Sequence, residues 1–223
     1  MTRMALDDLV VPGTAAAVAA LEVASAYHSP ALLNHSLRAY VWAAADGMAR
    51  GIGFDPELLY VAAMFHDIGL VPAFDSHTFA FEEAGGQVAR VFAAGAGWPA
   101  ERRERLSEVI IRHMWPQVDV SMDPEGHLLA RSTAAEIVGR NLDDWADDFK
   151  AEVLERYPRL DLIKDVIVLH FDATGLVLRC VVLQFVDLDL GFAHQSFVLR
   201  SKGLQLRLGH GVCERSHRRF PLF

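Results

Sequence analysis

Apolar residues recur at intervals of three and four over most of residues 14–171, the period of amphipathic α-helices. Residues that favour helix ends mark the boundaries as well. In the helix predicted over residues 55–69, Asp55 can cap, Pro56 suits the first helical position and Gly69 can end the helix. The predicted helices are residues 14–28, 30–51, 55–69, 81–95, 99–114, 124–142 and 143–157, with loops at 69–78 and 115–124. The pattern therefore predicts an all-α bundle.

The pattern changes after about residue 172. Residues 185–192 and 204–210 alternate apolar and polar positions, which predicts short strands. We therefore expect a helical domain over residues 1–172 and a strand-like or irregular appendage over 173–223. Three interpretations of the second segment remain open: a small β appendage, a hairpin packed on the helices, or sequence translated from another reading frame. We assign no site to it.

Composition indicates a globular protein. Apolar residues make up 52% of the 223 positions and charged residues 22%, enough for one domain with a sizeable core. No apolar stretch is long enough to span a bilayer, and the first residues contain acids rather than a signal-peptide core. The two cysteines, Cys180 and Cys213, do not have metal-site spacing. We expect a cytoplasmic, reducing location.

Charge is divided unevenly between the two segments. Residues 173–223 contain 7 Lys and Arg against 3 Asp and Glu, so the totals of 21 and 29 leave 14 basic and 26 acidic residues for 1–172, a net charge of −12. A domain this acidic is unsuited to nucleic acid or an anionic membrane surface. It also disfavours polyanionic substrates, and we expect a small-molecule substrate.

His66 and Asp67 follow directly on the apolar run of residues 60–65. A buried carboxylate without a partner costs at least several kcal/mol, so it is normally paired or bound to a metal. Adjacent helical residues point about 100° apart, so one ion can bind both only near a helix end or across a local distortion. With His35 from another helix they form a plausible metal site. The ordinary alternative is a helix-terminal Asp67 held by an arginine.

Five segments, spread in order over roughly residues 28–171, resemble the HD-domain superfamily of metal-dependent hydrolases, and within it the cyanamide hydratase-like group. They are "SPALLNHSLRAYVWAAA", "LYVAAMFHDIGL", "FAFEEAGGQVA", "VIIRHM" and "RYPRL". The resemblance implies an all-α fold whose metal is held by a His, an adjacent His-Asp pair and a later Asp. His35, His66 and Asp67 match the first three positions.

The fourth position departs from the family pattern. Where the family reads T-A-x-D-x-x-G, this chain reads "TAAEIVG", with Glu136 in place of the aspartate. Glutamate keeps an oxygen ligand but reaches one methylene further. We predict Glu136 as the fourth metal ligand. The alternative is a helix-surface pair with Arg140 at i, i+4 spacing, worth roughly 0.2–0.5 kcal/mol.

The resemblance also places a histidine near the metal at His113, where a neutral imidazole could orient substrate or relay a proton. A histidine favoured by the C-terminal helix dipole is an equally good interpretation. Arg38 could hold Asp67 or another carboxylate, and Glu82 matches a family motif but also suits an exposed helix start. Three further histidines receive no role: His28, His77 and His127.

The implied cofactor is one divalent ion, Zn or Fe first and Mn or Ni as alternatives. The implied reaction is addition of metal-activated water to a small substrate, cyanamide giving urea, with Asp67 as the base and His113 assisting. A phosphohydrolase acting on a nucleotide is one rival. Against it, Leu70 follows "HDIG" where signalling-type HD enzymes often have lysine, and Lys150 and Lys164 are remote in sequence. A metal- or ligand-binding domain without turnover is the other.

Overall fold

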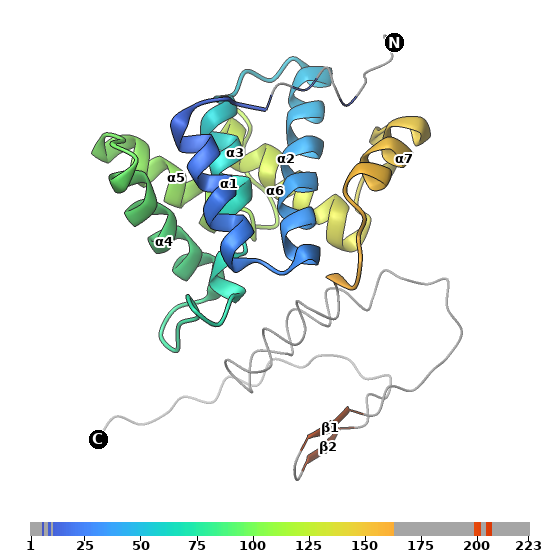
Figure 1. Cartoon of the computed structure of the whole chain (residues 1–223). Helices are drawn as coiled ribbons and strands as arrows, with labels where there is room; N and C mark the ends of the chain where they lie inside the picture. Colours follow the sequence, from blue (N-terminus) through green and yellow to red (C-terminus); the bar gives the residue numbers. More distant parts are fainter. Residues whose placement is uncertain (1–5, 7–8, 10, 163–198, 202–203, 207–223) are drawn as a thin grey trace. The chain divides into compact units, whose positions relative to one another are not determined.

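The structure is a computed structural model that describes residues 6, 9, 11–162, 199–201 and 204–206 (Figure 1). The chain divides into two compact units, residues 1–188 and 189–223. The described part of the first unit contains seven α-helices and no strand. These helices are α1 (Ala15–Tyr27), α2 (Pro30–Arg50), α3 (Pro56–Phe65), α4 (Phe81–Gly95), α5 (Ala100–Arg112), α6 (Pro124–Val138) and α7 (Asp147–Arg156). The all-α prediction is confirmed.

Three of the predicted helices are at least four residues shorter than expected. The helix predicted over 124–142 ends at Val138, and a 3₁₀ turn takes up part of each of the other two. The segment predicted as 55–69 ends as α-helix at Phe65 and continues as η2 (Ile68–Leu70). The last predicted helix begins at Asp147 because η3 (Leu142–Asp144) and an extended Trp145 precede it. Trp145 is buried against Trp42, with ring centroids 5.3 Å apart. Tertiary packing of an aromatic residue thus overrides the local helical pattern.

In the second unit the described residues form an antiparallel pair, β1 (Leu199–Ser201) and β2 (Leu204–Leu206), with Leu199 opposite Leu206. β2 lies within the strand predicted for residues 204–210. The strand predicted for 185–192 and the boundary predicted at 172–173 lie outside the described residues.

Helix α3 is the centre of the bundle. Its residues from Leu58 to Phe65 are all buried, and α1, α2, α4, α5 and α6 contact it. Figure 1 shows α4 and α5 on one side of α3, and α2 and α7 on the other. No helix in the described part of the chain has both the length and the apolar character needed to cross a bilayer. His66 and Asp67, which follow directly on α3, are buried as well.

Gly69 lets η2 approach the start of α4 more closely than any other residue type would allow. A Cβ atom at Gly69 would overlap the carbonyl oxygen of Phe81 and lie 2.9 Å from its carbonyl carbon and 3.0 Å from the nitrogen of Gly85. These are backbone atoms, which cannot move aside as a flexible side chain can. The glycine predicted as a helix terminator therefore sets the distance between the His66–Asp67 turn and α4.

We expect Gly69→Ala to lower the free energy of unfolding by about 1–3 kcal/mol, because the new methyl group forces η2 away from α4. Urea denaturation of the purified variant measures this change. The matched control is Gly95→Ala: Gly95 is helical and exposed, nothing lies near its Cβ position, and the change should stabilise by about 0.5–1 kcal/mol. An unchanged midpoint for Gly69→Ala would contradict the close approach.

Asp123 ties α5 to the start of α6. It is 2% exposed, accepts a hydrogen bond of 2.6 Å from the Gly126 amide as the N-cap of α6, and binds Arg105 and Arg112, the latter at 2.8 Å. Burial acts to raise the pKa of the Asp123 carboxyl, but hydrogen bonds from both arginines outweigh it and hold the pKa below 3.8. Asp123 therefore favours the folded state only while it is ionised.

Because the pKa of Asp123 falls on folding, its contribution to stability is fully present above the unfolded pKa and disappears as pH drops through the lower folded value. We expect Asp123→Asn to lower the free energy of unfolding by roughly 1.5–3 kcal/mol at pH 7. The difference from the parent chain should shrink below about pH 4. Urea denaturation between pH 7 and pH 3 tests this, with Asp143→Asn, at an exposed position, as control. A difference that stays constant with pH would refute the ion-pair explanation.

Candidate metal centre

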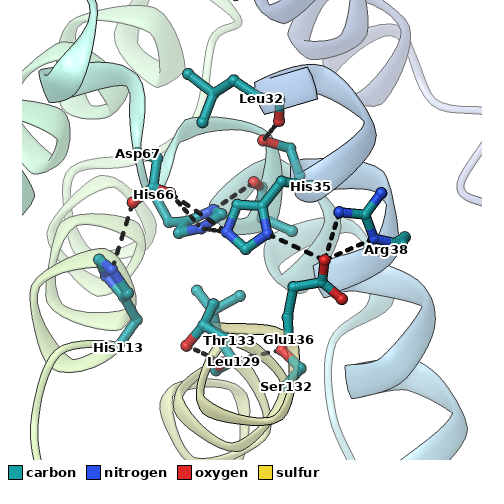
Figure 2. Close-up of polar contacts among 12 residues, drawn as sticks. Leu32, His35, Arg38, His66, Asp67, His113, Leu129, Ser132, Thr133 and Glu136 are labelled. Atoms are coloured by element: carbon teal, nitrogen blue, oxygen red, sulfur yellow. Dashed lines mark hydrogen bonds and ion pairs between the residues drawn. The ribbon is translucent and has the colours of Figure 1, made fainter. Parts of the chain in front are cut away.

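Three predicted ligands meet where α2 faces the end of α3. His35 lies in the second turn of α2, His66 is the C-cap of α3, and Asp67 precedes η2 (Figure 2). The Nε2 atoms of His35 and His66 are 3.1 Å apart. Asp67 Oδ2 lies 3.3 Å from His35 Nε2 and 3.2 Å from His66 Nε2. The three atoms therefore form a nearly equilateral triangle.

The triangle has the dimensions of a mononuclear metal site. Two ligand atoms that are each about 2.0–2.2 Å from one ion are separated by about 2.8–3.6 Å for bond angles between 90° and the tetrahedral value. All three edges fall within that range. His35, His66 and Asp67 are exposed by only 1%, 0% and 6%, so water does not screen the carboxylate. The donor set suits a divalent ion.

A hydrogen bond from Nδ1 of His66 leaves its other ring nitrogen, Nε2, free to bind a metal. His66 Nδ1 lies 2.8 Å from the carbonyl oxygen of Ala63, to which it can only donate, so the neutral ring carries its lone pair on Nε2. Because α3 ends at Phe65, Asp67 leaves the helical path and both adjacent side chains can face one point. The helix end thus resolves the 100° separation that a continuous helix would impose.

Glu136 lies at the opposite edge of the His35 ring (Figure 2). Its Oε1 is 3.8 Å from His35 Nδ1, an atom that has no hydrogen-bond partner among the described residues. Glu136 Oε1 accepts a 2.7 Å hydrogen bond from Arg38 Nε, and Oε2 accepts one of 3.2 Å from Trp42 Nε1. This geometry favours a residue that orients His35 over a metal ligand. Ligation of the metal by Glu136 stays a prediction. The structure groups only His35, His66 and Asp67 among the described residues as possible ligands of one ion.

Arg38 is the buried cation of the site. It is fully buried and bonds Glu136, and its Nη1 donates to the carbonyl oxygens of Tyr157 and Pro158 at 2.8 and 2.9 Å. The carboxylate it holds is thus Glu136 rather than Asp67. The predicted alternative pair of Glu136 with Arg140 is replaced by this contact with α2. The backbone of "RYPRL" takes up the remaining donors of Arg38.

His113, the C-cap of α5, faces the other oxygen of Asp67. Its Nε2 lies 3.7 Å from Asp67 Oδ1, and its ring meets that of His66 edge to face with centroids 4.9 Å apart. His113 Nδ1 is bonded to the carbonyl oxygen of Ile110, which leaves the lone pair of the neutral ring on Nε2. His113 therefore both caps its helix and points an unprotonated ring nitrogen at Asp67.

The pKa values reflect a buried site that attracts a cation. Burial disfavours charge on His35, but Asp67 and Glu136 outweigh it and raise the pKa of His35. Burial likewise opposes ionisation of Asp67, but His66 and His35 hold its pKa well below the usual value. The pKa of Glu136 falls to about 2 because His35 and Arg38 outweigh its burial, whereas burial and His66 lower that of His113 to about 4.

Two residues near the centre were not predicted from the sequence. Trp42 reaches Glu136 from one turn beyond Arg38, and this i, i+4 spacing on α2 is a signal that sequence reasoning could have used. His28 is buried at the C-cap of α1, with no motif to distinguish it.

Glu82 is half-buried, and burial is the main cause of its raised pKa, to which Glu83 and Asp67 also contribute.

Comparison with known proteins agrees with the geometry. The family model described as "HD domain" matches residues 32–174. Two proteins of Saccharomyces cerevisiae, cyanamide hydratase DDI2 and cyanamide hydratase DDI3, are each 30% identical over 133 residues. The match covers 58% of this chain and 59% of each relative, so the chain spans less than two thirds of their length. The resemblance found in the sequence is confirmed.

Proposed function

Since this chain belongs to the HD domain family, we propose that it is a metal-dependent enzyme that adds water to a small neutral substrate, with hydration of cyanamide to urea as its reaction. The observation that carries the proposal is the buried triangle of His35, His66 and Asp67, which offers two imidazoles and a carboxylate at the spacing of one ion. The similarity to two cyanamide hydratases supports the substrate class.

Three arginines that could supply a cationic clamp for phosphate are engaged elsewhere. Each is bound to a carboxylate: Arg38 to Glu136, Arg90 to Glu104 and Arg112 to Asp123. Lys150 pairs with Asp147, and Lys164 lies outside the described residues. Phosphoryl transfer relies on cationic groups aimed at the phosphate, so these pairings favour an uncharged substrate.

The burial of the centre also favours a substrate of few atoms. His113 is 6% exposed, as is Asp67, and both imidazoles of the triangle are almost completely enclosed. A nucleotide would need a wide opening beside these groups. A linear molecule the size of cyanamide fits the enclosure better. Together with the acidic balance of residues 1–172, this supports a small-molecule substrate and no nucleic-acid partner.

The two oxygens of Asp67 have separate tasks in the proposal. Oδ2 joins His35 and His66 in holding the ion, with Zn or Fe preferred and Mn or Ni as alternatives. A divalent ion there supplies Lewis acidity and lowers the pKa of water from 15.7 towards roughly 7. Asp67 Oδ1 receives a proton from the attacking water, and His113 Nε2, 3.7 Å away, relays it. Water oxygen bonds to the nitrile carbon, a C–N π bond opens, and the proton reaches the nitrile nitrogen to give isourea. Transfer of the remaining O–H proton to this nitrogen then gives urea.

The test is a comparison of products. The chain loaded with Zn²⁺ or Fe²⁺ is incubated separately with cyanamide and with nucleoside monophosphates, and urea and inorganic phosphate are measured. The proposal predicts urea without phosphate, and neither product from metal-free chain. Phosphate without urea would make the protein a phosphohydrolase. A bound metal with neither product would make it the non-catalytic binding domain. A cytoplasmic location remains part of the proposal.

A further inference from the structure

His28 is a buried polar side chain that no contact satisfies. It is 8% exposed, and neither Nδ1 nor Nε2 has a hydrogen-bond partner among the described residues. Leaving one buried donor or acceptor unpaired costs about 1–3 kcal/mol, and such groups are rare in folded proteins. A histidine with only a structural role would normally be paired as His66 and His113 are through Nδ1. His28 therefore has a ring donor and a ring acceptor that are both free to bind a ligand.

The charge state of His28 determines which hydrogen-bonding groups a ligand needs in order to bind it. Burial, assisted by His66, lowers the pKa of His28 to about 4, so the ring is neutral near pH 7. A neutral imidazole presents one N–H donor and one lone pair on opposite edges. It can therefore hold a group that accepts one hydrogen bond, donates one, or does both. It offers no charge to an anion.

His28 lies where the chain passes from α1 to α2, beside the metal centre. It is the C-cap of α1, and only Ser29 and the first turn of α2 separate it from the turn that carries His35. The neighbouring Tyr27 packs edge to face on Phe74, in the loop after η2, with centroids 4.7 Å apart. The charges of His66, Asp67 and His35 all act on its ring. The end of α1 thus borders the turn that carries Asp67.

We propose that His28 is a substrate-binding residue, in which the lone pair of one unpaired ring nitrogen accepts a hydrogen bond from the N–H group of a small neutral molecule. Nitriles, amides and ureas with an amino group belong to this class. The inference rests on the proposed function and adds a second contact to it: the metal-side groups act on the carbon that is attacked, and His28 holds the amino end. Substrates without an N–H group should bind less well.

The kinetic test uses the metal-loaded full chain. His28→Phe keeps a ring of similar size without hydrogen-bonding atoms, and we expect KM for cyanamide to rise about 10- to 100-fold while kcat changes less. His28→Gln, which restores a donor and an acceptor, should recover most of the loss. His77→Phe is the control, because His77 is exposed. Unchanged KM in folded, metal-loaded His28→Phe would overturn the inference, whereas absence of urea from the parent chain would overturn the proposed function.

A binding measurement keeps the inference testable without turnover or a folded variant. Urea is titrated into the parent chain loaded with diamagnetic Zn²⁺, and the ring Cε1–H signals of the histidines are followed by NMR. We expect the His28 signal to shift and saturate while that of His77 stays in place. A His28 signal that does not move at saturating urea would overturn the assignment, whatever the protein catalyses.

Discussion

Replacing His66 with alanine is expected to abolish metal binding and turnover together. His66 Nε2 forms two edges of the ligand triangle, at 3.1 Å to His35 Nε2 and 3.2 Å to Asp67 Oδ2. Loss of an outer partner alone typically lowers metal affinity about 10- to 100-fold, so loss of a ligand should exceed that. Asp67→Ala should have the same effect and also remove the oxygen that faces His113. Metal content after dialysis and urea release from cyanamide measure the two losses.

The control for this experiment is His127→Ala. His127 has a ring nitrogen bonded to the carbonyl oxygen of Val118 and belongs to neither the triangle nor its supports. It should keep its metal and its activity. Full activity in either His66→Ala or Asp67→Ala would show that the centre is elsewhere. Because both alanines leave a cavity in the core, thermal unfolding of the zinc-free chains should accompany the assay.

The second large effect concerns stability. We expect Arg38→Leu to lower the free energy of unfolding by about 3–5 kcal/mol, because the buried Glu136 carboxylate then keeps only one arginine partner, the exposed Arg159, whose Nη2 lies 4.0 Å from Oε1. Arg38 is fully buried, Glu136 is 2% exposed, and Arg38 also bonds the carbonyl oxygens of Tyr157 and Pro158. Urea denaturation of the metal-free chain measures the change without a contribution from the ion.

The matched variant is Arg38→Leu combined with Glu136→Gln, which removes both charges. It should be more stable than Arg38→Leu alone, since the uncompensated carboxylate is gone. If the double variant is no more stable, the pair is not the source of the effect. Glu136→Gln alone also separates the two roles of Glu136: a residue that orients His35 leaves a weakened metal site, whereas loss of the ion as complete as in Asp67→Ala would make Glu136 a ligand.

The fold could be predicted because its signals are local. Helix α2 begins at Pro30 and ends with Gly51 in the left-handed region, at a φ of 65°, as a proline start and glycine stop predict. The early end of α3 could not be predicted from periodicity. The 3₁₀ turn that follows it packs Gly69 against the backbone of Phe81, which lies twelve residues further along the chain.

The candidate site was predicted in part for the same reason. His66 and Asp67 are adjacent in sequence, so they can share an ion wherever the helix ends beside them. Glu136 matches a ligand position by its place in a motif, but sequence does not say which edge of His35 its longer side chain reaches. His28 escaped prediction because its significance lies in what it fails to contact, and that is visible only once the surrounding helices are in place.

The most direct test of the metal centre is anomalous diffraction at the absorption edge of Zn or Fe, from crystals of the full chain grown with that ion. The proposal predicts one peak per chain, about 2.0–2.2 Å from His35 Nε2, His66 Nε2 and Asp67 Oδ2. A strong peak bound by other residues, or no peak in crystals whose protein is otherwise folded as described, would contradict it.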